Sequence, residues 1–148
     1  MAISSLKDLI DGEFKTIIED DDVKKEKVEK IILCSGKVFF DLDKRRKELK
    51  IENVGILRME QLYSFPYDDL EKSLLKYSNT KDYIWCQEEP ANQGAWFSHR
   101  HRIQRVLDRF SSNQIRLVSR PSASAPAVGL NKLHKIQQEA LIEEALKS

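Results

Sequence analysis

The stretch "VEKIILCSGKVFFDLDKRRKEL", residues 28–49, joins an apolar run to a segment with a helical repeat. Residues 28–35 are dense in aliphatic side chains and predict a strand, and Gly36 follows it as a turn glycine. The apolar positions of the next segment fall close to one helical face, with basic residues opposite: Val38, Phe39, Leu42 and Leu49. This stretch therefore predicts a strand–turn–helix unit.

The same kind of unit recurs along the chain. Further strands are expected at residues 52–60, 81–89 and 113–120, with a helix opened by Pro66 and another that follows Gly94. Strands that alternate with helices of about 10–15 residues indicate an α/β fold. We therefore expect three layers, with a mostly parallel sheet and helices on both faces. The near-continuous apolar strands agree, because a parallel strand is covered on both sides.

Two segments frame this repeating region. Residues 4–18 predict a short helix and an extended piece, and the charge run "EDDDVKKEKVEK" (residues 19–30) predicts a solvated connector. A last helix is expected from about Leu130 to Lys147, with Leu133, Ile136 and Ala140 facing a core. Since 148 residues suit one domain better than two, we divide the chain into an N-terminal part, residues 1–27, and one α/β domain, residues 28–148.

Composition excludes several classes of protein. The chain is 41% hydrophobic and 33% charged, and 25 basic against 24 acidic residues leave a formal charge of +1, so no nucleic-acid partner is expected. Its apolar runs are far below the roughly 20 residues of a membrane span, and no signal layout opens it. A cytoplasmic protein, or one of the mitochondrial matrix in a eukaryote, is expected. Cys34 and Cys86 are interpreted as buried reduced thiols.

The stretch "IWCQEEPANQGAW", residues 84–96, holds the strongest candidate site residues. Glu88 and Glu89 resemble a general acid and base, but adjacent side chains of a strand point to opposite faces, so they are not expected to converge on one substrate atom. The position still matters, because ligands and partners bind at the carboxyl ends of the strands in a doubly wound sheet.

The turn after these acids carries amide side chains. Pro90 holds Glu89 extended, and "ANQG" must turn sharply before the next helix. Asn92 and Gln93 are therefore candidates for binding the backbone of a partner. A capped loop, with one glutamate bonded to nearby amides, explains the same residues equally well.

The other motifs give weaker indications. "SGK" (residues 35–37) lacks the spacing of a phosphate loop or a dinucleotide fingerprint, so an N-cap serine and a turn glycine are favoured over an anion site. His99 and His101 are about 200° apart around a helix, which favours a solvated basic face over a metal site. No Ser-His-Asp or Cys-His set is found, and no catalytic or metal-binding residue is assigned. The stretch "SRPSASAPAVG" (residues 119–129) is interpreted as a crossing loop.

Four long motifs carry a resemblance to a known family. "LCSGKVFFDLDKRRKE", "ILRMEQLYSFP", "WCQEEPANQGAWF" and "SRPSASAPAVG" followed by "HKIQQEALIEEAL" occur in the order and spacing of the C-terminal region of 2-oxoglutarate dehydrogenase. The resemblance extends from Ser4 onward. It implies one domain of a longer chain, with the fold of a transketolase C-terminal domain.

The resemblance also implies a parent enzyme of the tricarboxylic acid cycle. That oxidoreductase decarboxylates 2-oxoglutarate on thiamine diphosphate and passes the succinyl unit to a lipoyl group. Thiamine diphosphate and magnesium are bound by the preceding domains and none by this one, so the fragment alone is expected to be inactive. Its implied partners are those domains, the second subunit of a homodimer, and the lipoyl succinyltransferase component.

Two hypotheses about this domain remain open at this point. The first is a structural and assembly domain in which the loop at Glu88 forms a joint with neighbouring domains. The alternative is an effector-binding module that holds a coenzyme A-like anion at strand-exit loops; an independent small enzyme or adaptor has no residues to support it. Either hypothesis uses the same candidate contact residues: Lys37, Arg58, Glu88, Glu89, Asn92, Gln93, Gly94 and Arg120.

Overall fold

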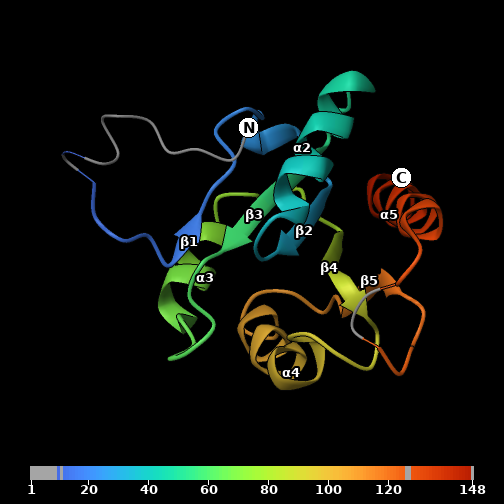
Figure 1. Ribbon diagram of the computed structural model, residues 1–148. Coiled ribbons are helices and arrows are strands. Elements are labelled where there is room, and N and C mark those ends of the chain that lie inside the picture. Colours follow the sequence, from blue (N-terminus) through green and yellow to red (C-terminus); the bar gives the residue numbers. More distant parts are fainter. Residues whose placement is uncertain (1–9, 11, 126–127, 148) are drawn as a thin grey trace.

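A five-stranded sheet in the order β1-β3-β2-β4-β5 lies at the centre of the computed structural model (Figure 1). The strands are β1 (Ile17–Ile18), β2 (Lys30–Cys34), β3 (Val54–Met59), β4 (Asp82–Pro90) and β5 (Ile115–Arg120). The structure describes residues 10, 12–125 and 128–147. Strands β2 to β5 pair in parallel, and β1 pairs antiparallel with β3 at one edge. The expected mostly parallel sheet is confirmed.

Helices cover both faces of this sheet. They are α2 (Val38–Glu48), α3 (Tyr67–Leu74), α4 (Trp96–Leu107) and α5 (Asn131–Leu146), with a short 3₁₀ turn η1 (Lys25–Lys27) before β2. Alternate residues of β2 explain the layers, because Ile32 and Cys34 pack with residues of α2 and α5, whereas Ile31 and Leu33 pack with residues of α3 and α4. The three-layer α/β fold is confirmed (Figure 1).

The strand order fixes where the sheet can receive a ligand or a partner. Strand β2 lies between β3 and β4, so the chain proceeds to one side of β2 through α2 and crosses to the other side through α3. Such a reversal opens a crevice at the carboxyl ends of the two strands that flank it. The residues that follow β2 and those that end β4 therefore meet at this switch point.

The final helix packs by a different face than predicted. Leu133 and Ile136 are 40% and 53% exposed and Ala140 is exposed, whereas Leu141, Ile142, Ala145 and Leu146 are buried. The helix carries apolar residues on two faces, and the one that meets the sheet belongs to its C-terminal half. The prediction that Leu133, Ile136 and Ala140 face the core of this chain is wrong.

Leu49 is a second misplaced apolar residue. It is 43% exposed, because α2 ends at Glu48 and the backbone then turns through Lys50, whose φ is 54°. Val38 and Leu42, by contrast, are fully buried as predicted. The helical repeat of the sequence therefore predicted the buried face of α2 correctly, but only up to the end of that helix.

The charged connector is less solvated than the sequence indicated. Asp20 is only 6% exposed and forms an ion pair with Arg46, which is 3% exposed. The second carboxylate oxygen of this pair is 3.3 Å from Nη2 of Arg46, and the backbone N–H of Ile56 donates to Asp20 Oδ2 at 2.9 Å. The prediction of a fully solvated run is wrong at Asp20 for this reason. The predicted boundary between the N-terminal part and the α/β domain, between residues 27 and 28, is not tested by these contacts and stays a prediction.

The N-terminal helix expected within residues 4–18 falls largely outside the described residues. The extended piece that follows it corresponds to β1. In the described part of the chain, no helix is both long and apolar enough to cross a lipid bilayer.

Candidate functional site

The crevice at the switch point is a pocket of about 430 Å³. Ser35 and Gly36 line it from the end of β2, residues 87–89 line it from β4, and Ser98 and His99 line it from α4. This is the edge of the sheet at which the sequence placed the candidate residues. Glu88, Glu89 and Gly94 all border the pocket.

Gln87 organises this edge, and the sequence analysis missed it. Its side chain is 3% exposed. Its carbonyl oxygen accepts hydrogen bonds from Trp85 Nε1 at 2.9 Å and from the backbone N–H of Trp96 at 3.1 Å. Its amide nitrogen donates to the backbone carbonyls of Gln93 at 2.7 Å and Pro90 at 3.1 Å. One side chain thus ties the end of β4 to the following turn and to the start of α4.

Two signals in the sequence point to this role. Gln87 lies two residues after Trp85, and alternate residues of a strand share a face, so the indole and the amide lie next to each other. A polar side chain on a buried face must find hydrogen-bond partners. In the structure the side chain of Gln87 finds these partners in the turn that follows.

Gly94 is required by the same arrangement. Its φ is +69°, a conformation that favours glycine. A Cβ atom at this position would lie 2.8 Å from Nε2 and 3.0 Å from Oε1 of Gln87. The glycine therefore allows the turn to close over the buried amide.

Glu88 and Glu89 lie on the irregular end of β4. The register of β4 with β5 shifts between Cys86 and Pro90, so strict alternation does not separate the two acids, and both border the crevice. An oxygen of Glu88 is 3.4 Å from Nζ of Lys37. Glu88 is thus engaged in an ion pair with a candidate cation.

The amides of the turn bind a loop of the same chain. Asn92 donates to the carbonyl of Ala123 at 3.0 Å and accepts from its N–H at 3.1 Å. Gln93 donates to the same carbonyl at 3.0 Å. In this structure the two amides fix the crossing loop after β5, and the hydrogen bonds of the described residues do not include the expected contact between these amides and Glu88 or Glu89.

The three candidate cations have separate environments. Lys37 pairs with Glu88 and is 64% exposed. Nε of Arg58 is 2.6 Å from Glu60, although the N–H is not aligned for a hydrogen bond, and the guanidinium lies 4.8 Å from the ring centre of Phe39.

Arg120 is buried against α5. It is 4% exposed, and its guanidinium donates to Gln138 Oε1 at 2.6 Å and lies 3.1 Å from His134 Nδ1. The partners of the three cations are thus different residues on different elements. These contacts give no support to the effector-binding alternative.

His99 is less solvated than predicted. Its Nε2 lies 2.9 Å from the carbonyl of Leu62 and its Nδ1 lies 2.7 Å from Ser98 Oγ, so the half-buried ring connects α4 to the loop after β3. His101 is exposed, as expected for a basic helix face. Within the described residues, no group of three or more His, Cys, Asp and Glu side chains is placed to hold a metal ion.

Cys34 and Cys86 are free and buried, as predicted. They are register partners on β2 and β4. Burial raises the pKa of the Cys34 thiol well above its ordinary value and raises the pKa of Cys86 to about 12. Both side chains therefore act as small apolar core residues.

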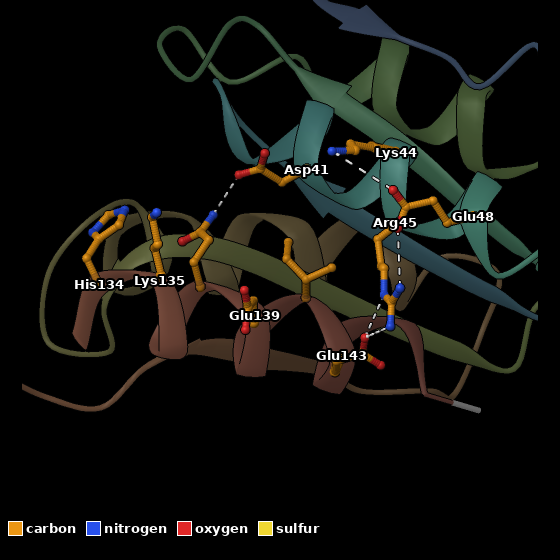
Figure 2. Close-up of a pocket in the computed structure, with 10 residues that line it drawn as sticks. Asp41, Lys44, Arg45, Glu48, His134, Lys135, Glu139 and Glu143 are labelled. Carbon is orange, nitrogen blue, oxygen red and sulfur yellow. Dashed lines mark hydrogen bonds and ion pairs between the residues drawn. The ribbon is translucent and has the colours of Figure 1, made fainter. Parts of the chain in front are cut away.

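A larger groove of about 840 Å³ separates α2 from α5 (Figure 2). Figure 2 shows Arg45 reaching from α2 to Glu143 of α5, with Nη2 2.5 Å from the carboxylate. Gln138 donates to Asp41 across the same groove at 3.0 Å. The groove is therefore bridged by polar contacts that hold two helices together, and it is separate from the switch point.

Comparison with known proteins identifies close relatives. Residues 3–146 match the family model described as 2-oxoglutarate dehydrogenase C-terminal. The chain is 43% identical over 147 residues to the 2-oxoglutarate dehydrogenase E1 component of Haemophilus influenzae, covering 99% of this chain and 16% of that protein.

Two further relatives agree with this match. The 2-oxoglutarate dehydrogenase E1 component of Coxiella burnetii is 44% identical over 150 residues, with coverage of 99% and 16%. The 2-oxoadipate dehydrogenase complex component E1 of Xenopus laevis is 40% identical over 148 residues, with coverage of 98% and 16%. The chain thus spans 16% of the length of these relatives, and the family resemblance of its motifs is confirmed.

Proposed function

We propose, because this chain belongs to the 2-oxoglutarate dehydrogenase C-terminal family, that it is the structural and assembly domain at the C-terminal end of an E1 component. One observation carries the proposal: nearly the whole chain aligns with relatives of which it makes up 16%. The remaining part of such a protein would perform the chemistry. That chemistry is the decarboxylation of 2-oxoglutarate, followed by transfer of the succinyl unit to a lipoyl group.

Thiamine diphosphate and magnesium belong, in this proposal, to the preceding domains. A magnesium–diphosphate site needs oxygen ligands that converge on the ion. Within the described residues, the acids nearest the crevice do not form such a group of three or more. The residues of this domain therefore do not fit the cofactor, and their proposed role is to hold the surrounding domains in place.

The loop from Glu88 to Gly94 is the proposed joint with neighbouring domains. Its backbone is fixed from inside by Gln87, so the loop is preorganised before any partner arrives. Glu88 and Glu89 lie at its start and border the open crevice. A rigid loop with carboxylates at the switch point suits a partner surface that offers cations or backbone N–H groups.

The proposed partners follow from the parent enzyme. They are the preceding domains of the same polypeptide, the second subunit of a homodimer, and the lipoyl succinyltransferase component. The proposed compartment is the bacterial cytoplasm, or the mitochondrial matrix in a eukaryote.

Calorimetry and an activity assay test the proposal. The purified 148-residue chain should fold, should give no saturable heat with thiamine diphosphate and magnesium, and should not turn over 2-oxoglutarate with a lipoyl acceptor. The full-length Haemophilus influenzae E1 component serves as the positive control in both assays. Turnover by the 148-residue chain alone would contradict the proposal.

Substitution in a full-length polypeptide that carries this domain tests the joint. Glu88→Lys should weaken its assembly, measured by sedimentation, because the joint would lose a carboxylate. Glu52→Lys is the matched control, because Glu52 lies on the loop before β3, at the opposite edge of the sheet, and its side chain is 78% exposed. Equal effects of the two substitutions would argue against a joint at Glu88.

A further inference from the structure

The N-terminal half of α5 contributes no buried residue to the core. From Asn131 to Ala140 every side chain of the helix is exposed or half-buried, whereas the C-terminal half packs apolar residues against the sheet. Side-chain hydrogen bonds join this N-terminal half to other elements, from Gln138 to Asp41 of α2 at 3.0 Å and from Arg120 of β5 to Gln138 at 2.6 Å. A helix end with few buried apolar contacts opens at a low free-energy cost, so these polar contacts decide whether it stays on the fold.

Arg120 is the centre of these contacts. Its side chain is 4% exposed, and its Nη1 and Nη2 lie 3.1 Å and 3.5 Å from Nδ1 and Nε2 of His134. The hydrogen-bond partners of its guanidinium in the described part of the chain are the amide of Gln138 and this imidazole, and its Nε is buried without a partner. A guanidinium is always charged and has only donors. A buried cation of this kind is strongly disfavoured beside a second positive charge.

The ring of His134 can accept a hydrogen bond from Arg120 only while the ring is neutral. One nitrogen of a neutral imidazole has a free lone pair, whichever tautomer is present, whereas both nitrogens of a protonated imidazole carry hydrogen. Protonation of His134 would therefore remove an acceptor from Arg120 and place a second cation next to it, across the present distance of 3.1 Å. Imidazoles ordinarily gain a proton as the pH falls from about 8 to about 5.

The other charged groups near His134 line the groove between α2 and α5 (Figure 2). They are Asp41, Lys44, Arg45 and Glu48 of α2, and Lys135, Glu139 and Glu143 of α5. Glu48 lies within ion-pair distance of Lys44 and Arg45. Glu143 pairs with Arg45, and Asp41 accepts from Gln138. These three carboxylates are thus engaged elsewhere, and the charged group in contact with the ring of His134 is the guanidinium of Arg120.

We infer that His134 and Arg120 form an acid-sensitive latch, which holds the N-terminal half of α5 against β5 near neutral pH and releases it when His134 gains a proton. The C-terminal half of the helix stays in place, because its buried residues are apolar. Release would open the groove beside α2 at the end where His134 lies (Figure 2). This regulatory device goes beyond the proposed assembly function and does not depend on it.

Hydrogen exchange measured by mass spectrometry tests the latch in residues 136–140, whose amides are not adjacent to position 134. The wild-type 148-residue chain is compared with His134→Gln, because glutamine keeps an acceptor and gains no proton. The two proteins are compared at pH ~7.5 and again at pH ~5, which is above the range in which carboxylates ordinarily gain protons. The ordinary pH dependence of amide exchange cancels in the ratio of the two rates. The ratio should be near one at pH ~7.5, and the wild-type chain should exchange about tenfold faster at pH ~5, because it loses a hydrogen bond from a charged donor.

Two further variants distinguish the latch from a general effect of acid. In Arg120→Gln the protonated ring can donate to the new amide oxygen, so the pH response of residues 136–140 should also be lost. His101→Gln is the matched control, because His101 is exposed on α4, and it should keep the full response. Residues 141–146 report on the rest of the fold and should exchange alike in the wild-type chain and His134→Gln.

Three results would overturn the inference. They are a wild-type chain no faster than His134→Gln at pH ~5, a full pH response in Arg120→Gln, and a response lost equally in His101→Gln. None of them affects the calorimetric test of the proposed function, so the two failures are distinguishable.

Discussion

Gln87→Leu is the perturbation that most directly tests how the switch-point loop is held. Leucine has a similar volume, but it removes both the acceptor for Trp85 Nε1 and the donor to the carbonyls of Pro90 and Gln93. The indole of Trp85 is only 1% exposed, so its N–H would be left buried without a partner.

The size of the effect follows from these contacts. A stranded buried donor costs about 1–3 kcal/mol, and each hydrogen bond whose partner can turn to water costs about 0.5–1 kcal/mol. The backbone N–H of Trp96 and the carbonyl of Gln93 belong to half-buried residues and can recover water. We therefore expect Gln87→Leu to lower the free energy of unfolding by about 2–4 kcal/mol.

Urea denaturation followed by far-ultraviolet circular dichroism measures this loss, and hydrogen exchange of residues 90–95 measures the loosening of the loop. Gln61→Leu is the matched control, because Gln61 makes one exposed hydrogen bond, to the carbonyl of Ser64 at 2.7 Å; it should change stability by less than about 1 kcal/mol. The reasoning is refuted if Gln87→Leu and Gln61→Leu have the same stability and the same exchange rates in residues 90–95.

Three further predictions follow from the described contacts. Gly94→Ala should cost about 2–3 kcal/mol, because its Cβ meets the buried glutamine amide. Gly36→Ala, with φ +72° and no atom within 4 Å of the added Cβ, should cost only about 1 kcal/mol; equal losses in thermal melts would contradict this. Asp20→Asn should lower the free energy of unfolding by about 2 kcal/mol, because it removes one of the two carboxylates that pair with the buried guanidinium of Arg46 and leaves only Asp43; a urea midpoint close to wild type would argue against it. Burial alone would raise the pKa of Glu19, but hydrogen bonds from two lysines and a serine lower it from 4.5 to about 2, so its stabilisation is present above pH ~4.5 and is lost as the pH falls towards 2. Glu19→Gln should therefore destabilise the chain by about 1 kcal/mol near pH 7 and by progressively less between pH ~5 and 2, in denaturation curves recorded across that range; a constant difference would exclude the mechanism.

The fold was predictable from the sequence because each strand and helix carries its own periodic signal. The dense apolar run before Cys34 and the helical repeat after Gly36 specify a strand–turn–helix unit locally. Repetition of that unit then leaves a parallel sheet with two covered faces as the natural arrangement. Local pattern and global fold agree in this region.

The failures occur where one local pattern permits two outcomes. Helix α5 has two apolar faces, and only the packed structure selects the one with Leu141 and Ala145 over the one with Leu133 and Ile136. The acidic run before β2 was predicted to be solvated. Asp20 is buried instead, because Arg46, 26 positions later in the sequence, forms an ion pair with it. Both choices depend on contacts between distant parts of the chain, which a periodic pattern does not encode.

The candidate site shows the same division. Its location at the carboxyl ends of the strands was predictable from the fold class, and Glu88 and Glu89 border the pocket found there; their role as contact residues stays a prediction. The rigidity of the loop after β4 was not predictable, because it depends on Gln87, whose partners are backbone groups of that turn. Arg120 stays a candidate contact residue, and in this structure its guanidinium donates to Gln138 on α5, a partner that no local pattern of the sequence indicates.

These contacts connect the switch point to α5 through hydrogen bonds that short stretches of backbone join. Gln87 holds the turn, Asn92 holds the crossing loop at Ala123, and Arg120 at the end of β5 holds Gln138 on α5. Neighbouring groups in a satisfied polar network constrain one another. Loosening α5 would therefore also loosen the loop that borders the crevice. The coupling should appear as faster hydrogen exchange of residues 90–95 in Gln138→Ala, which removes the acceptor for Arg120; unchanged exchange would contradict it.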